Sequence, residues 1–235
     1  FVSIIRSFSL TKRLILPQEV FTIMKSPAPA CLIIHGFAGN TGEIGPLCEF
    51  LETRGFVVEC PTLAGHSGRR KDLSHSTSED WLASARICLK RLKQQHTSVI
   101  LIGFSMGGLI AARLSLEIPV DKLVLLSTPI FVWDFQKIFQ NLRQDWKLKK
   151  CEHLSYYLHN SFDKPIAALL RFNRFMHQTK KIFCLITSPV LICHGLNDSI
   201  VKYKSAKYIY ESILSHQKKL KFYRGVNHLI CHSDN

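Results

Sequence analysis

Apolar positions along the chain follow two patterns, short continuous runs and longer stretches of helical spacing. Continuous runs such as Ala30 to Ile34 are typical of strands buried on both faces of a parallel sheet. The expected strands are residues 19–24, 30–34, 56–60, 99–102, 122–127, 189–193 and 220–223. The expected helices are residues 46–54, a stretch behind a Ser76-x-x-Glu79 capping box, 106–117 and 205–214. This repeated alternation predicts an α/β fold, a mostly parallel central sheet with helices on both faces.

The alternation is interrupted between Pro129 and about Ser188, where no strand-like run occurs. Large apolar side chains at helical spacing fill the first part of this stretch: Phe131, Phe135, Ile138, Phe139, Leu142 and Trp146. They fit a helical insertion packed on the core, and equally a lid whose apolar underside lines a pocket. We predict one domain in three parts: core residues 1–128, a small helical cap over 129–188, and core residues 189–235.

Composition indicates a soluble, intracellular globular protein. The 235 residues are 46% hydrophobic, enough for a full core, and no apolar run approaches the roughly 20 residues of a membrane-spanning helix. The N-terminal stretch has no continuous apolar region followed by a cleavage site. Eight cysteines occur without C-x-x-C spacing, which predicts free buried thiols rather than a disulfide framework. We therefore predict a cytoplasmic location.

The chain is strongly basic, with a formal net charge of +14. Such a charge can serve nucleic acid, an anionic membrane surface or an acidic substrate. Lysine and arginine concentrate loosely over residues 137–150, 164–181 and 202–221, without a continuous basic block or a nucleic-acid motif. We predict a solvated basic surface, no nucleic-acid partner, and at most weak association with an anionic membrane surface. The sequence does not indicate an oligomeric state.

The strongest chemical signal is Gly103-Phe104-Ser105-Met106-Gly107, which follows the apolar run Val99 to Ile102 and leads directly into a helical stretch. A strand, a very short turn and a helix place Ser105 at the bend. Glycines are needed at 103 and 107 because the two backbones pass there without room for a Cβ atom. Ser105 is therefore a candidate nucleophile, and the alternative is a serine in an ordinary tight turn.

Three polar residues follow the C-terminal ends of three expected strands: Ser105, Asp198 and His228. In an open parallel sheet these ends lie along one edge, where ligands bind, so residues distant in sequence can meet there. Each residue has an ordinary structural explanation when taken alone. Their order along the chain, Ser then Asp then His, matches the order of a nucleophile, acid and base around a nucleophile elbow.

In these motifs the chain resembles the α/β-hydrolase superfamily, and most closely its small carboxylesterases and monoacylglycerol-lipase-like enzymes. The matching segments are residues 35–40 (His-Gly-Phe-Ala-Gly-Asn), Gly65-His66, residues 103–108, Gly195-x-x-Asp198-x-x-Val201 and His228. The similarity covers residues 30 to 232 in the same order, with an insertion at the superfamily's usual cap position. These motifs are fairly specific for the superfamily and poorly specific for the substrate.

The resemblance implies a role for each matching residue. Ser105 would be the nucleophile, His228 the general base and then acid, and Asp198 the group that orients His228. The backbone N–H groups of Phe37 and Met106 would form the oxyanion hole. No metal or organic cofactor is implied. His66 lies in a loop where we interpret it as structural rather than catalytic.

The chain departs from the superfamily pattern in three places. Ser67 follows Gly65-His66 where glycine is common, and Val226-Asn227 precede the histidine where a small residue is common. The fold normally closes with a helix after the histidine loop, whereas only Leu229 to Asn235 follow here. We therefore expect the C-terminal helix to be missing: either the sequence is a fragment, or one sheet face is partly bare. In the second case we expect lower stability and a tendency to aggregate.

The sequence thus predicts a serine hydrolase that cleaves short- to medium-chain carboxylic esters through an acyl-enzyme, with a small hydrophobic ester as substrate. The aromatic insertion favours a hydrophobic acyl or alcohol group, for example a monoacylglycerol. A thioesterase or peptidase remains an alternative, because the same three residues do not determine the leaving group. A non-catalytic ligand-binding or interaction protein on the same scaffold is the alternative from another class.

Overall fold

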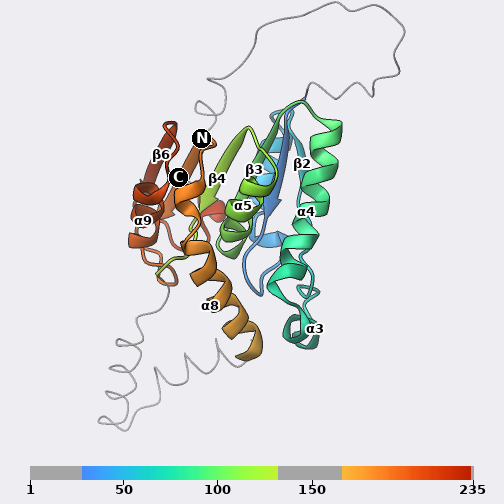
Figure 1. Cartoon of the computed structure of the whole chain (residues 1–235), viewed down its shortest axis with the longest axis vertical. Helices are drawn as coiled ribbons and strands as arrows, with labels where there is room; N and C mark the ends of the chain where they lie inside the picture. Colours follow the sequence, from blue (N-terminus) through green and yellow to red (C-terminus); the bar gives the residue numbers. More distant parts are fainter. Residues whose placement is uncertain (1–27, 132–165, 234–235) are drawn as a thin grey trace, which may run out of the picture.

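The computed structural model describes residues 28–131 and 166–233. Six strands form one sheet in the order β2-β1-β3-β4-β5-β6, and every neighbouring pair is parallel (Figure 1). The strands are β1 (Ala30–Ile34), β2 (Val57–Glu59), β3 (Val99–Phe104), β4 (Lys122–Leu126), β5 (Val190–Gly195) and β6 (Lys218–Tyr223). The predicted parallel sheet is confirmed. The strand predicted over residues 19–24 lies outside the described residues.

Helices follow the strands in the predicted rhythm. They are α2 (Gly45–Glu52), α3 (Arg70–His75), α4 (Ser78–Gln95), α5 (Met106–Glu117), α8 (Ile166–Lys180) and α9 (Lys204–Ser212). Short 3₁₀ turns are η1 (Thr41–Glu43), η2 (Phe183–Leu185) and η3 (Ile230–His232). The capping box of α4 lies one residue later than predicted, because Thr77 and Asp80 form it. The predicted cap, Ser76, is instead buried and accepts a hydrogen bond from the Trp81 indole.

The two faces of the sheet are covered differently. Leu32 and Leu101, which lie side by side in register, belong to the apolar cluster packed under α4, α5, α8 and α9. Their neighbours along the strands, such as Ile33 and Ile102, face the other way and pack toward α2. Side chains of a strand alternate between faces, so strands buried on both sides need apolar residues at consecutive positions.

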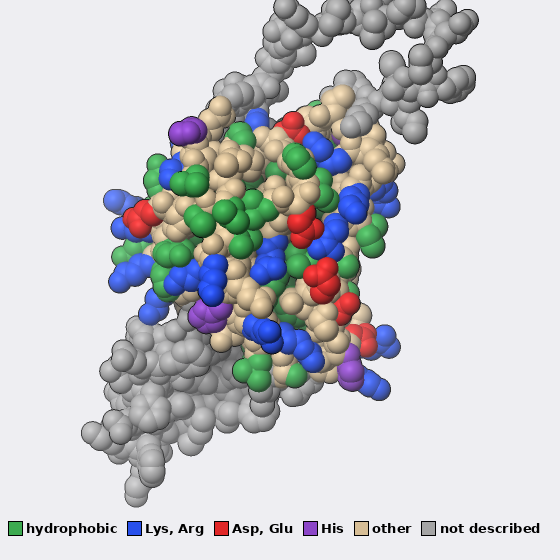
Figure 2. Space-filling view, in the orientation of Figure 1, with side chains coloured by type: hydrophobic (Ala, Val, Ile, Leu, Met, Phe, Trp, Pro, Cys, Tyr) green, Lys and Arg blue, Asp and Glu red, His purple; other side chains and the backbone are tan. Residues whose placement is uncertain are grey.

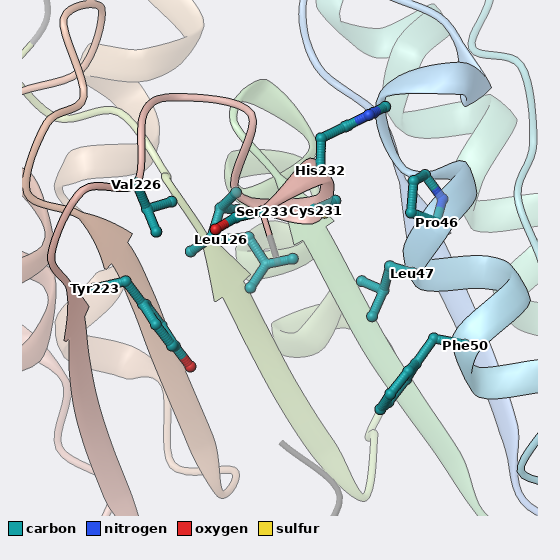
Figure 3. A pocket seen from close by; sticks show the side chains of 10 residues that line it. Pro46, Leu47, Phe50, Leu126, Tyr223, Val226, Cys231, His232 and Ser233 are labelled. Atoms are coloured by element: carbon teal, nitrogen blue, oxygen red, sulfur yellow. The ribbon is translucent and has the colours of Figure 1, made fainter. Parts of the chain in front are cut away.

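A cavity of about 380 Å³ lies on the α2 face of the sheet. Figure 3 shows Leu47 and Phe50 of α2 on one side of it and Tyr223 and Val226 on the other. Turn η3, which follows His228, closes part of this face.

The cysteines differ in part from the expectation of free thiols. Cys48 of α2 and Cys60, just after β2, form a disulfide pair. Five other described cysteines are free: Cys31, Cys88, Cys184, Cys193 and Cys231. Spacing along the chain could not reveal the pair, because the two side chains meet only when α2 packs beside β2.

The described part of the predicted cap is helical, since α8 and η2 both fall within residues 129–188. Apart from Phe131, the predicted apolar stripe lies outside the described residues. None of the helices described in residues 28–131 and 166–233 combines the length and the hydropathy of a membrane span. Lysine and arginine side chains are spread over the visible face of the molecule rather than gathered in one block (Figure 2).

Candidate active site

Ser105 stands at a sharp bend between β3 and α5, with a φ of 51° and a ψ of −120°. A positive φ is unusual for a residue with a side chain and is a mark of strained functional turns. A Cβ atom at Gly103 would lie 2.2 Å from the carbonyl oxygen of Gly107, and one at Gly107 would lie 2.1 Å from that of Ile34. The two glycines therefore allow the close backbone approach that the sequence predicted.

The structure brings the three predicted polar residues together. The Ser105 hydroxyl lies 3.1 Å from Nε2 of His228, and Nδ1 of His228 lies 2.7 Å from Oδ2 of Asp198. The carboxylate can only accept a hydrogen bond, so Nδ1 carries the proton and Nε2 is free to accept from the hydroxyl. The side chain of His228 is 12% exposed, which leaves the pair shielded from bulk water.

Asp198 is held by the loop that follows β5. Its Oδ1 accepts backbone N–H groups of Ile200 and Val201 at 2.9 and 2.8 Å, and its side chain is fully buried. Burial opposes ionisation, but the hydrogen bond and charge of His228 and the two N–H groups outweigh it. The pKa of the Asp198 carboxyl therefore lies below its usual value. Asp198 is therefore ionised at neutral pH and accepts the hydrogen bond from Nδ1 of His228.

His194 is a neighbour of the site that the sequence reasoning did not assign. Its Nε2 lies 3.0 Å from the carbonyl oxygen of Val201 and 3.4 Å from Oδ2 of Asp198. Burial lowers the pKa of His194. A neutral imidazole that donates to Val201 fixes the loop whose N–H groups hold Asp198.

The loop after β1 places backbone N–H groups beside Ser105. Neither the N–H of Phe37 nor that of Met106 donates a hydrogen bond to another described residue. A Cβ atom at Gly36 would lie 3.3 Å from that of Ser105, so the loop passes directly next to the serine. Phe37 stacks on Phe172 of α8 with ring centroids 4.9 Å apart. Both N–H groups are thus available to a ligand atom at Ser105.

A carboxylate that sequence reasoning missed supports this loop. Oε2 of Glu43, in η1, accepts the N–H of Gly36 at 3.0 Å. A Cβ atom at Gly39 would overlap the same carboxylate at 2.1 Å, so the loop wraps closely around it. His232 lies 3.0 Å from the carbonyl oxygen of Gly42 through Nε2, which joins the turn after His228 to η1.

Two histidines pack beneath the same loop. Nδ1 of His35 donates to the carbonyl oxygen of Gly36 at 2.9 Å, and Nε2 accepts the N–H of Leu63 at 3.2 Å. Burial lowers the pKa of His35 to about 4. His66 is buried against Trp81 and Phe37, and its Nδ1 lies 3.0 Å from the carbonyl oxygen of Ala64.

The cavity beside α2 is separate from the three polar residues Ser105, Asp198 and His228. The lining of the cavity in Figure 3 includes none of the three polar residues of the site. Within residues 28–131 and 166–233, no group of three or more His, Cys, Asp or Glu side chains is placed to hold a metal ion.

Comparisons with known proteins agree with the fold and the motifs. The chain is 24% identical over 208 residues to a carboxylesterase of Bacillus subtilis (strain 168), covering 86% of this chain and 85% of that one. It is 27% identical over 209 residues to a thermostable monoacylglycerol lipase of Bacillus sp. (strain H-257), covering 84% and 82%. A solved structure of the metagenome-derived lipolytic enzymes LipS and LipT matches with a TM-score of 0.71 at 18% identity, covering 87% of each chain. The family model described as Hydrolase_4 (serine aminopeptidase, S33) matches residues 25–161 and 142–235, so the chain belongs to this family.

Proposed function

We propose that the protein is a serine hydrolase that cleaves carboxylic esters, with Ser105 as nucleophile, His228 as general base and acid, and Asp198 as the orienting carboxylate. The observation that carries the proposal is the hydrogen-bonded chain from Ser105 through His228 to Asp198. A serine hydroxyl is protonated at neutral pH and needs such a base in contact to become a nucleophile.

The reaction follows from this geometry. Oγ of Ser105 attacks the acyl carbon while Nε2 of His228 takes its proton, and the carbonyl oxygen becomes an oxyanion that the N–H groups of Phe37 and Met106 bind. Collapse breaks the bond to the alcohol, which leaves with the proton from His228. Water then repeats the sequence on the acyl-enzyme and releases the acid. In both halves of the reaction His228 moves the proton and the same two N–H groups bind the oxyanion, and water is the second nucleophile.

The substrate is proposed to be a small hydrophobic ester of short to medium chain length. The ring of Phe37, in the loop that passes Ser105, stacks on Phe172 of α8, and this aromatic pair supports an apolar wall for an acyl or alcohol group. The named relatives, a carboxylesterase and a monoacylglycerol lipase, favour an oxygen ester over a thioester or a peptide. The stacking of α8 on the oxyanion loop also supports our proposal that residues 129–188 form a cap. A cytoplasmic location stays a prediction.

Replacement of the nucleophile tests the proposal. With nitrophenyl butyrate and octanoate, Ser105→Ala should lower kcat on the order of 10⁶-fold, because no other group can form the acyl-enzyme. Ser115→Ala, on the same helix, is the matched control, since the Ser115 hydroxyl only bonds a carbonyl oxygen of its own helix. A fluorophosphonate should label the parent chain and Ser115→Ala but not Ser105→Ala. Equal hydrolysis by Ser105→Ala would remove Ser105 from the mechanism.

A further inference from the structure

Two loops at the edge of the candidate site carry exposed apolar side chains. The loop after β5 exposes Leu196, Ile200 and Tyr203 by 41%, 49% and 39%, and the loop after β6 exposes Leu229 by 40%. Single exposed apolar residues are common on protein surfaces, but a group of four around one site indicates a contact surface. We call these four residues, with the basic residues Lys204, Lys207 and Arg224, the rim patch.

Hydrogen bonds join the loop after β5 to the loop after β6. The N–H of Leu196 donates to the carbonyl of Tyr223 at 2.9 Å, and that of Asn197 donates to Val226 at 3.0 Å. In return, the side-chain oxygen of Asn197 accepts the N–H of Gly225 at 3.0 Å. The rim patch is therefore formed before any partner arrives.

The charge of the rim patch has one sign. Residues 196–207 and 224–229 contain three lysines and one arginine, and their single carboxylate, Asp198, is fully buried and bound to His228. Within the described ranges, no carboxylate forms an ion pair with Lys204, Lys207 or Arg224. The ammonium of Lys207 lies 5.5 Å from the ring centre of Tyr203, so cationic and apolar groups are interleaved. Figure 2 shows basic and apolar side chains together, with an acidic one among them, on the side of the molecule where α9 lies.

We propose that the rim patch docks the protein on an anionic lipid surface, with the candidate active site facing that surface. Apolar side chains at loop tips enter the boundary between headgroups and acyl chains, tyrosine favours that boundary, and each nearby lysine or arginine adds about 1 kcal/mol of attraction to anionic lipid. An acidic protein would match the cations but would not need the projecting apolar tips. The consequence for substrate choice rests on the proposed function: the esters come from the lipid surface.

Vesicle sedimentation tests the docking directly. The full chain carrying Ser105→Ala, which leaves the lipids intact, should bind vesicles of phosphatidylcholine mixed with phosphatidylglycerol, and bind phosphatidylcholine alone much less. Added salt should weaken the binding. Lys204→Glu with Lys207→Glu should reduce the binding on the order of tenfold or more. Leu196→Ser with Tyr203→Ser should reduce it as well, because apolar area no longer enters the lipid.

Matched variants distinguish an effect of the rim patch on vesicle binding from an effect of the protein's net charge. Lys90 and Lys181 are exposed lysines outside it, so Lys90→Glu with Lys181→Glu changes the net charge equally and should retain binding. Ile87, which is 67% exposed on α4, gives the apolar control Ile87→Ser. Equal loss in rim and control variants, equal binding to neutral vesicles, or stronger capture by polyglutamate or a DNA duplex would overturn the proposal.

Activity on dissolved nitrophenyl butyrate, measured with Ser105 present, keeps the two proposals distinguishable. Rim variants should retain this activity, because their side chains lie outside the proposed triad and oxyanion hole. If rim and control variants bind vesicles equally while the chain still hydrolyses the dissolved ester, only the proposal of lipid docking is refuted. Vesicle binding by a chain in which Ser105 proves inert would refute the proposed function alone.

Discussion

The candidate active site is built from two halves that are held in place in different ways. The nucleophile half consists of β1, β3, α5 and their loops, and its strands are buried at every position. The acid–base half consists of β5, β6 and their loops, and β6 is an edge strand with no fully buried residue. Core packing fixes Ser105, whereas loop-to-loop hydrogen bonds fix Asp198 and His228. We therefore expect the loss of a hydrogen bond to disturb the positions of Asp198 and His228 more than the position of Ser105.

Beyond the catalytic chain, the halves also meet where Phe104 packs against the ring of His228 and where His232 reaches η1. His232, four residues after His228, bonds the turn that contains Glu43, and Glu43 supports the loop of Phe37. The oxyanion loop and the histidine loop thus share a support. Three experiments test the acid–base half, the nucleophile half and this shared support in turn.

The largest effect should come from the acid–base half. Asp198→Asn can still accept N–H groups from the loop but cannot stabilise a charged His228 or enforce its tautomer, so kcat should fall roughly 10⁴-fold. The unfolding midpoint should change little by comparison. Asp72→Asn, on α3, is the control and should keep full activity. A loss of less than tenfold in Asp198→Asn would mean that this half is not organised by the carboxylate.

The nucleophile half should respond to pH through its folding free energy. The pKa of His35 is about 6.5 in the unfolded chain and about 4 when buried, so the unfolded state binds more protons between these values. The free energy of unfolding should therefore fall as pH drops from 6.5 to 4, by about 3 kcal/mol from this residue. Urea titrations at several pH values measure the slope. His35→Gln should have a shallower slope, and an unchanged slope would exclude His35 as its source.

The smallest effect should come from the shared support. Glu43→Ala removes the acceptor of the Gly36 N–H, which loosens the loop of Phe37, so kcat should fall on the order of 10- to 100-fold. KM should change much less, because oxyanion contacts act in the transition state. Glu43→Gln should recover part of the rate. Glu49→Ala on α2 is the control, and equal kcat in both alanine variants would show that Glu43 only fills space.

The sequence predicted those parts of the fold that depend on local patterns. Strands β1, β3, β4 and β5 are apolar at consecutive positions because both of their faces are buried, and this signal needs no tertiary information. Helix α3 was not predicted, because its six residues are too few to show a period. The N-cap of α4 was predicted one residue too early. The hydroxyl of Ser76 accepts a hydrogen bond from the indole of Trp81 instead of capping the helix, and the sequence does not reveal this contact.

The candidate site was predictable where residue type and chain order suffice. The elbow glycines and the order of Ser105, Asp198 and His228 identified the residues that the structure brings together. The supporting residues Glu43, His194 and His232 were not identified. Their contacts depend on how separate segments fold back on one another, and a lone carboxylate or histidine in a short turn or at a strand end has no spacing signal.

The end of the sheet at β6 has a consequence for encounters between copies of the chain. An edge strand offers N–H and C=O groups to which a foreign strand could add. In the described sheet this edge carries Lys219 and Lys221, while the ammonium of Lys218 donates to carbonyl oxygens of Tyr210 and Ile213. The opposite edge, β2, is only three residues long. A second copy aligned along β6 would bring ammonium groups against ammonium groups. The sheet is therefore protected against growth from molecule to molecule by charge at one edge and by shortness at the other.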